Sequence, residues 1–194
     1  MDSVRASVLG GASWKCTCAW VGLELGRTIQ DAPDAWCFLR ESYIKKDGGI
    51  PVKNFERWLY QRDLPGYETT PAVKINQAIK MWMVDPGRYY DYVARKGMGI
   101  GFDLDENFLP EGLHSLAVKI SYFDGEEGAF KLVYRNNRGI QVRTITTTGK
   151  DQVKTATFFI KARINDAGTD NIFDFEIHSK EEIPVSFVRV IKNR

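Results

Sequence analysis

The sequence has 194 residues, of which 43% are hydrophobic and 12% aromatic, a composition typical of a folded domain and not of a disordered chain. Lys and Arg number 27 against 25 Asp and Glu, so no dominant charge would attract nucleic acid or an anionic membrane surface. No run reaches the roughly 18 apolar residues of a membrane span, which predicts a soluble protein without a membrane partner.

The first 37 residues give little indication of compartment or metal binding. Asp2 and Lys15 interrupt the apolar start, so we predict no secretory signal and expect an extracellular location only if the chain belongs to a secreted enzyme. The three cysteines, Cys16, Cys18 and Cys37, form no pattern of paired ligands. They are interpreted as buried or incidental thiols.

The sequence before residue 100 contains several different local patterns. Residues 31–43, DAPDAWCFLRESY, place Asp31 or Asp34 where a helix cap could be, but the stretch is too short to separate strand from helix. Residues 60–71 read as turn and linker because of their central Pro and Gly. Residues 71–84 predict a helix through apolar residues at helical spacing, namely Ile75, Ala78, Ile79 and Trp82.

After residue 100 the hydrophobic period drops to two, which indicates strands. Residues 114–122 and 129–135 form the clearest pair, and further strands are expected at 89–95, 100–104, 139–145, 153–160, 171–177 and 184–191. The register of the clearest pair predicts a core that contains Leu116, Val118, Ile120, Phe130 and Leu132. Tyr122 and Tyr134 share these faces and are also expected in the core.

Several short strands without crossover helices predict a mainly β fold: an antiparallel, jelly-roll-like β-sandwich with a short α-containing N-terminal segment. We divide the chain into an N-terminal segment, residues 1–70, and a β-sandwich module, residues 71–194. The N-terminal segment lacks the alternation seen later, so we expect the sandwich to be the stable unit.

A set of motifs in the second half resembles the C-terminal β-sandwich module of certain bacterial-type glycoside hydrolases. The matching elements are the pair Ala94-Arg95, the FDLD strand at 102–105, the YFDG strand end at 122–125 and the FKLVY strand at 130–134. The TGKD turn departs from the family, because Asp151 stands where these modules have Trp.

The resemblance covers roughly residues 30–192 and implies more than a fold. Residues 34–66 look like the tail of a preceding catalytic domain, so the N-terminal segment would be the remnant of a catalytic barrel. Such a barrel needs about 250 residues, and its catalytic carboxylates would then lie outside this chain. The implied partners are a polysaccharide or oligosaccharide and a catalytic domain.

The acidic residues at strand ends are the first candidates for a site. Asp103 and Asp105 fall on one face of a strand, where they could bind calcium or accept hydrogen bonds from sugar hydroxyls. The alternative is a solvated strand face that ends in a turn. Asp124, which precedes Gly125, is either a sugar-binding residue or simple turn chemistry.

Aromatic side chains are the second group of candidates, because sugar rings stack on them. We expect Tyr89, Tyr90 and Tyr92 to bind carbohydrate, with Trp82 as a further exposed candidate.

No catalytic motif accompanies these residues, although Glu24, Glu41 or Glu56 could belong to a glycosidase pair. The sequence therefore favours a non-catalytic carbohydrate-binding or accessory module of a polysaccharide-degrading enzyme. The alternatives are a purely structural bracing domain and a weak or cryptic glycoside hydrolase fragment.

Overall fold

The structure, a computed structural model, describes residues 28–43, 51–72, 78–80, 89–91, 94–166 and 172–193. These ranges contain twelve strands and no helix, hence no helix long and apolar enough to cross a membrane. The strands are β1 (Asp34–Tyr43), β2 (Pro51–Arg57), β3 (Leu59–Arg62), β4 (Thr70–Pro71), β5 (Ala78–Lys80), β6 (Tyr89–Asp91), β7 (Arg95–Leu104), β8 (Gly112–Asp124), β9 (Glu127–Asn136), β10 (Gly139–Thr148), β11 (Gln152–Ile164) and β12 (Phe175–Lys192).

The long strand β12 organises the main antiparallel sheet, because each half of it has different neighbours. Residues 175–179 lie between β9 and β7, whereas residues 185–192 lie between β8 and β1. One half of the sheet thus contains β10, β9, β12 and β7, with β3 and β4 paired to β7. The other half contains β11, β8, β12, β1 and β2.

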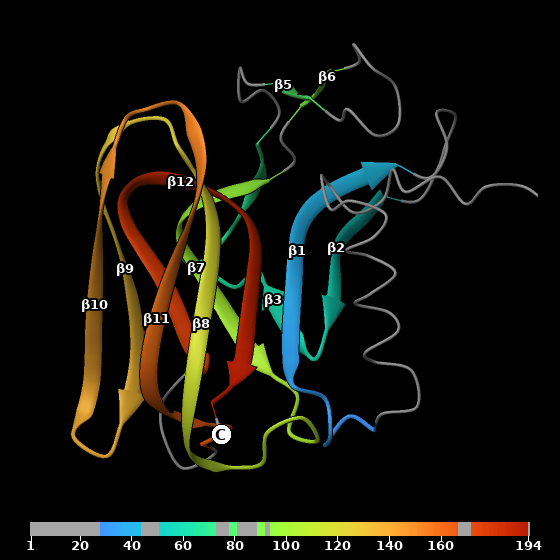
Figure 1. Cartoon of the computed structure of the whole chain (residues 1–194), viewed down its shortest axis with the longest axis vertical. Helices are drawn as coiled ribbons and strands as arrows, with labels where there is room; N and C mark the ends of the chain where they lie inside the picture. The colour runs from blue at the N-terminus through green and yellow to red at the C-terminus, as the bar shows by residue number, and fades with distance from the viewer. Residues whose placement is uncertain are drawn as a thin grey trace, which may run out of the picture.

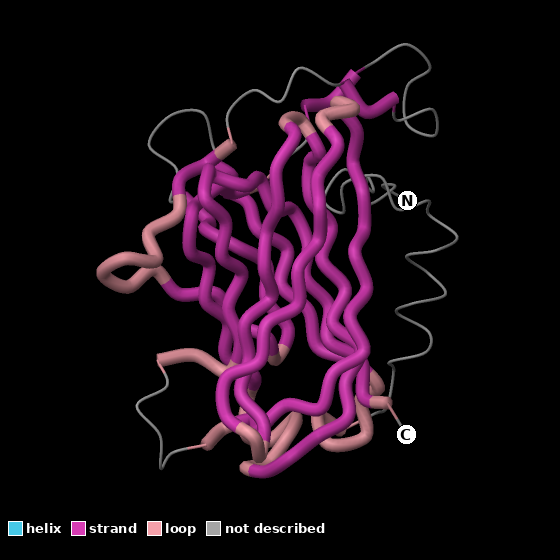
Figure 2. Tube along the Cα trace, turned by 90° about the vertical axis from the view of Figure 1, so that its left-hand side faces the viewer, coloured by secondary structure: helices cyan, strands magenta, loops and turns pink. Residues whose placement is uncertain are grey.

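The sheet folds over on itself at three neighbouring bends, and Figures 1 and 2 show its strands running along the long axis of the molecule. The chain bends between β8 and β9, between β10 and β11, and within β12, where the register with β7 shifts between His178 and Ile183. Because β10 pairs with β9 and β11 pairs with β8, the first two bends lie side by side, with residues 125–126 in the first and one residue more, 149–151, in the second.

A single main core fills the space between the two halves, and it confirms the predicted strand register. The five core residues predicted from alternation are at most 1% exposed, and Tyr122 and Tyr134 are buried as well. Rings from both halves meet there: the ring centroids of Tyr122 and Phe130 lie 4.9 Å apart, and those of Phe130 and Phe158 lie 6.4 Å apart. Burial of apolar area on this scale is the main force that holds the fold together.

The prediction of a helix over residues 71–84 is wrong in the part of this range that the structure describes. Residues 78–80 form strand β5, which pairs with β6 through Ala78–Asp91, Ile79–Tyr90 and Lys80–Tyr89. A short apolar run fits both the helical and the strand period of hydrophobic residues. Here the run forms a strand because it pairs with a second segment. No helix occurs in the described part of the N-terminal segment, so an α-containing segment has no support there.

Strands from the N-terminal segment belong to the same sheet as the later strands. Residues 31–43, for which the sequence could not separate helix from strand, contain β1. This strand pairs with β12 through residues 34–38. Its inward side chains Ala35, Cys37 and Leu39 are fully buried in the main core, which confirms a buried thiol at Cys37. β3 pairs with β7 through residues 59–62.

Candidate functional site: an open polar trough at the strand bends

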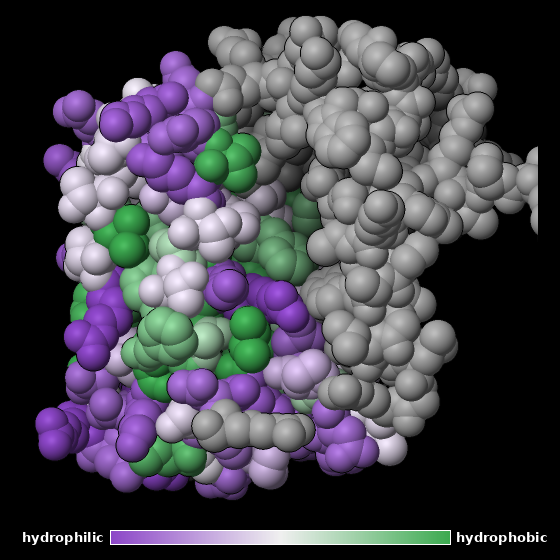
Figure 3. All heavy atoms as spheres, in the orientation of Figure 1, coloured by the Kyte–Doolittle hydropathy of each residue, from purple (hydrophilic) through white to green (hydrophobic). Residues whose placement is uncertain are grey.

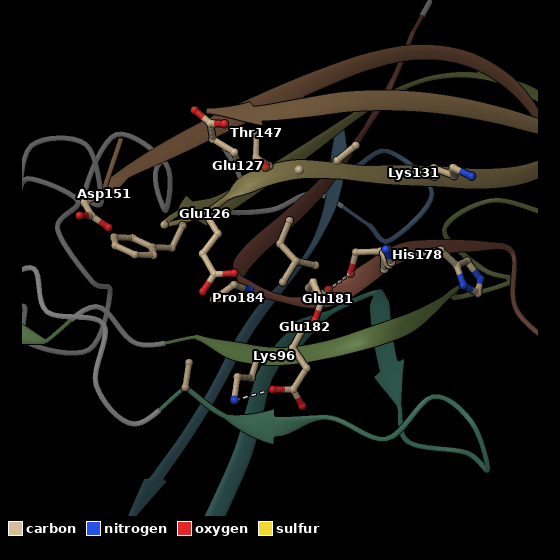
Figure 4. A pocket seen from close by; sticks show the side chains of 18 of the residues that line it. Lys96, Glu126, Glu127, Lys131, Thr147, Asp151, His178, Glu181, Glu182 and Pro184 are labelled. Carbon is tan, nitrogen blue, oxygen red and sulfur yellow. Dashed lines mark hydrogen bonds and ion pairs between the residues drawn. The ribbon is translucent and has the colours of Figure 1, made fainter. Parts of the chain in front are cut away.

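An open trough with a volume of about 1620 Å³ lies where the bends of the sheet meet (Figure 4). Its walls come from β4, the start of β7, the β8–β9 bend, the β10–β11 bend and the bulged centre of β12. The polar and charged residues that line it are Lys96, Glu126, Glu127, Lys131, Thr147, Asp151, His178, Ser179, Lys180, Glu181 and Glu182.

A hydrogen-bonded support beneath the trough joins two of its walls. The Asp124 carboxylate, which is fully buried at the end of β8, accepts hydrogen bonds from the Thr148 backbone N–H at 2.7 Å, the Thr148 hydroxyl at 2.7 Å and the Gly149 N–H at 3.2 Å. It also forms an ion pair with Lys154 of β11. Gly149 has a φ of +61°, a conformation that glycine adopts without the strain of a side chain. These contacts fix the β10–β11 bend against the β8–β9 bend.

The same contacts determine the charge state of Asp124. Burial alone would raise the pKa of this carboxyl, but the hydrogen bonds from Lys154, Thr148 and Gly149 outweigh burial and hold the pKa well below its usual range. Asp124 is therefore a carboxylate at every physiological pH. The structure places it under the trough wall, between Phe123 and Gly125, which both line the trough; its sugar-binding role stays a prediction.

Acidic groups outnumber basic groups in the trough. The Lys96 ammonium forms an ion pair with the Glu182 carboxylate, and both side chains are more than 40% exposed. Within the residues that the structure describes, Glu126 and Asp151 have no ion-pair partner. Figure 4 shows Glu126 pointing from the β8–β9 bend toward Pro184 of β12, with Asp151 at one end of the trough and Lys131 and His178 at the other.

This arrangement suits recognition of a polyhydroxylated ligand. Carboxylates accept hydrogen bonds, ammonium groups donate them, and the trough offers both around an open space. Apolar groups of Ala72, Ile183 and Pro184 also line it. The surface shown in Figure 3 likewise intersperses hydrophobic residues among hydrophilic ones. Among the described residues, no group of three or more His, Cys, Asp or Glu could hold a metal ion.

Asp103 lies away from the trough, at a smaller cavity of about 300 Å³ that it lines with Glu106, Asp166 and Asp174. Burial raises the pKa of Asp103 to about 6, and the neighbouring Asp174 carboxylate acts in the same direction. Asp174 itself accepts backbone hydrogen bonds from Leu104 at 2.7 Å and Asn165 at 2.6 Å. It thereby holds the end of β7 against the residue after β11.

Asp105 follows β7 and makes the contacts of a turn residue. Its carboxylate accepts hydrogen bonds from the Tyr60 hydroxyl at 2.8 Å and the Asn107 backbone N–H at 2.8 Å. Burial would raise its pKa, but these bonds outweigh burial and lower the pKa of Asp105. Calcium binding by Asp103 and Asp105 stays a prediction.

The remaining sequence candidates fall partly outside the described residues. Tyr89 and Tyr90 lie in β6, but their side chains, like Tyr92, Trp82, Glu24 and the Glu41 side chain, are outside the described part. Glu56 lies at the end of β2, where its carboxylate accepts two hydrogen bonds from Arg62, at 2.8 and 2.9 Å. The described contacts place Glu56 in an ion pair.

Most of the trough residues were missed by the sequence interpretation. Lys96 lies on β7, Lys131 lies on β9, and His178 and Glu181 lie on β12. These three strands share no motif that sequence alone would connect. The only local signal was the DGEEG stretch at 124–128, which predicts a tight connection between two strands. The signal that could have indicated the trough is a set of charged residues close to strand ends in three separate segments of the chain.

Comparisons with known proteins assign this chain to no family. No family model matches the sequence, and no curated protein matches it significantly. A solved structure described as PRD1 vertex protein P5 is similar over 80% of this chain and 83% of that one, with 7% sequence identity and a TM-score of 0.33. A similarity at this level carries no argument about fold or function. The fold and the site define a mainly β, antiparallel protein that has an open polar trough at its strand bends.

Proposed function

We propose that this chain is a non-catalytic carbohydrate-binding module, a jelly-roll-like β-sandwich accessory to a polysaccharide-degrading enzyme, and that its ligand binds in the trough. The observation that carries the proposal is the trough itself: an open space whose walls carry both carboxylates and ammonium groups. A polysaccharide needs such an open site, because its chain must enter and leave the protein at both ends.

The resemblance to glycoside hydrolase sandwich modules supports the same site. Two of the matching motifs, the YFDG strand end and the FKLVY strand, lie at or beside the trough, as does the turn that departs from the family, where Asp151 replaces Trp. An aromatic ring at that position would stack on a sugar, whereas Asp151 can only accept hydrogen bonds from it. We therefore expect binding that depends on hydrogen bonds and is weak per sugar unit.

Binding to a panel of immobilised and soluble glycans tests the proposal, followed by calorimetric titration of any ligand found. The double variant Glu126→Gln, Asp151→Asn should weaken binding roughly tenfold or more, because two charged acceptors become neutral amides. The matched control is Glu106→Gln, Glu111→Gln, which makes the same charge change on exposed residues before the opposite end of β8. The control should bind as the wild type does.

The same experiments separate the two alternatives. A folded chain that binds no glycan in the panel would contradict the proposal and favour a purely structural bracing domain. Release of reducing ends from polysaccharide by the isolated chain would contradict its non-catalytic part and favour a weak hydrolase fragment. Binding that the trough variant and the control lose equally would move the ligand away from the trough.

A further inference from the structure

Strand β10 is an edge of the sheet that no other described strand covers. Among the residues that the structure describes, β10 pairs only with β9, in an unbroken register from Gly139–Asn136 to Thr148–Glu127. Figure 1 shows β10 as the outermost strand of its half, and Ile140 and Val142 are 64% and 49% exposed. A long edge without a partner is a template for pairing with another strand.

The register identifies the backbone groups that face outward. The two-residue connection 137–138 closes on the pair Asn136–Gly139, so the odd-numbered residues of β10 share hydrogen-bonded pairs with β9. The N–H and C=O groups of Ile140, Val142, Thr144 and Thr146 then point away from the sheet. In the described part of the chain no hydrogen bond is found for the backbone N–H groups of these four residues, whereas that of Thr148 binds Asp124.

Devices that usually protect a sheet edge are missing from β10. The strand has ten residues and contains no proline, no lysine and no bulge, and its one charged residue is Arg143. Its outward surface is built from Ile140, Val142 and threonines, which favour β pairing. Val133 of β9 lies directly opposite Val142 and extends the apolar surface by one strand.

We propose that β10 is a self-association edge, at which a second copy of this chain pairs antiparallel about a two-fold axis at Val142. In this register Val142 lies opposite its own copy and Ile140 lies opposite Thr144 of the copy, which closes about six backbone hydrogen bonds. The apolar side chains of Ile140, Val142 and Val133 from both copies form one continuous surface patch.

Self-complementarity favours a second copy over another extended chain. About the axis at Val142, Arg143 lies opposite Gln141 and Arg138 lies opposite Thr146, so no like charges face each other. A two-fold axis at Thr144 would instead oppose Arg138 to Lys150 at both ends of the ladder. The contact is confined to one strand from each copy, which places it among small, transient interfaces.

Sedimentation equilibrium of the wild-type chain over a concentration series up to about 1 mM tests the proposal. The expected result is a reversible monomer–dimer equilibrium. Val142→Lys should raise the dimer dissociation constant roughly tenfold or more, because two ammonium groups would meet at the axis. Val142→Pro should do the same, since the N–H that proline lacks is not used in the pairing with β9.

The matched control is Val153→Lys, which makes the same change on β11, where Val153 is 40% exposed and outside the proposed ladder. It should dimerise as the wild type does, and circular dichroism should show that all variants fold. A wild type that stays monomeric across the series overturns the proposal. So does a dimer that a folded Val142→Lys variant leaves as stable as before, because another surface would then hold the copies together.

Discussion

Replacement of Asp124 by Asn tests whether this buried carboxylate holds the trough together. Asn keeps the shape of the side chain and can still accept the hydrogen bond from the Thr148 N–H, but it loses the charge that faces Lys154. The lost charge-assisted hydrogen bond costs about 1.5 kcal/mol, and the ion pair, screened because Lys154 is 29% exposed, adds about 1 kcal/mol. We expect the free energy of unfolding to fall by about 2 to 3 kcal/mol.

Urea unfolding at pH 7, followed by circular dichroism, measures this loss, with Glu126→Gln as the control. Glu126 is exposed two residues away, so its substitution should change stability by less than about 0.5 kcal/mol. A loss for Asp124→Asn no larger than that of the control would contradict a supporting role for this carboxylate, which would then contribute only as an ordinary turn residue.

The pH dependence of the wild type checks the same carboxylate from another direction. Asp124 has a folded-state pKa below its unfolded value of about 3.9, so its contribution to stability is complete above about pH 5. It is lost progressively as the pH falls below 4, toward the folded-state pKa. The Asp124→Asn variant should lose less stability than the wild type over this acid range.

Three further predictions concern residues outside the trough. Gly101→Ala should lower the free energy of unfolding by about 1 to 3 kcal/mol or more, because an added Cβ would lie 2.1 Å from the Phe173 ring. Adding Phe173→Leu should recover part of this loss, which chemical denaturation of the single and double variants would measure. Asp103→Asn should raise the free energy of unfolding by about 1 kcal/mol at pH 7 and by less at pH 4. The reason is that folding raises the pKa of Asp103 to about 6, so the cost of its charge grows from about pH 4 and is complete only above about pH 6. Equal gains at both pH values would contradict this. If Asp103 and Asp105 bind calcium, calcium at about 100 times its dissociation constant should stabilise the wild type by roughly 2.7 kcal/mol. The Asp103→Asn, Asp105→Asn variant should gain nothing. If calcium shifts the melting temperature of neither protein, these residues bind no calcium.

The strands after residue 100 could be predicted from sequence because each alternates with one face on the core. The pairs that carry Val118 and Leu132 fix the register, since a slip by one residue would expose every apolar side chain. β1 could not be assigned, because DAWCFL is short and apolar on both faces of the strand. The two strands expected at 171–177 and 184–191 are one strand, β12, whose bulged centre reads as a turn in sequence.

The trough could not be predicted, because it exists only after the sheet has folded over. Glu126 and Lys96 are thirty residues apart, and only the bend of β8 into β9 beside the bulge of β12 brings both to one space. Asp124 illustrates the reverse difficulty. Sequence marked it as a turn residue or a sugar ligand. Its observed partners are Thr148, in the TGKD turn, and Lys154, in the strand expected at 153–160, and no local pattern connects Asp124 with either.

Amide chemical-shift mapping by NMR, with an oligosaccharide taken from the glycan survey, tests directly whether the trough binds carbohydrate. We expect the shifts to concentrate on the residues of the three bends, 123–129, 147–151 and 178–184, and the Glu126→Gln, Asp151→Asn variant to show smaller shifts at equal ligand concentration. Shifts that concentrate instead around Asp103 and Asp174, or that persist unchanged in the variant, would contradict the claim that the trough binds carbohydrate.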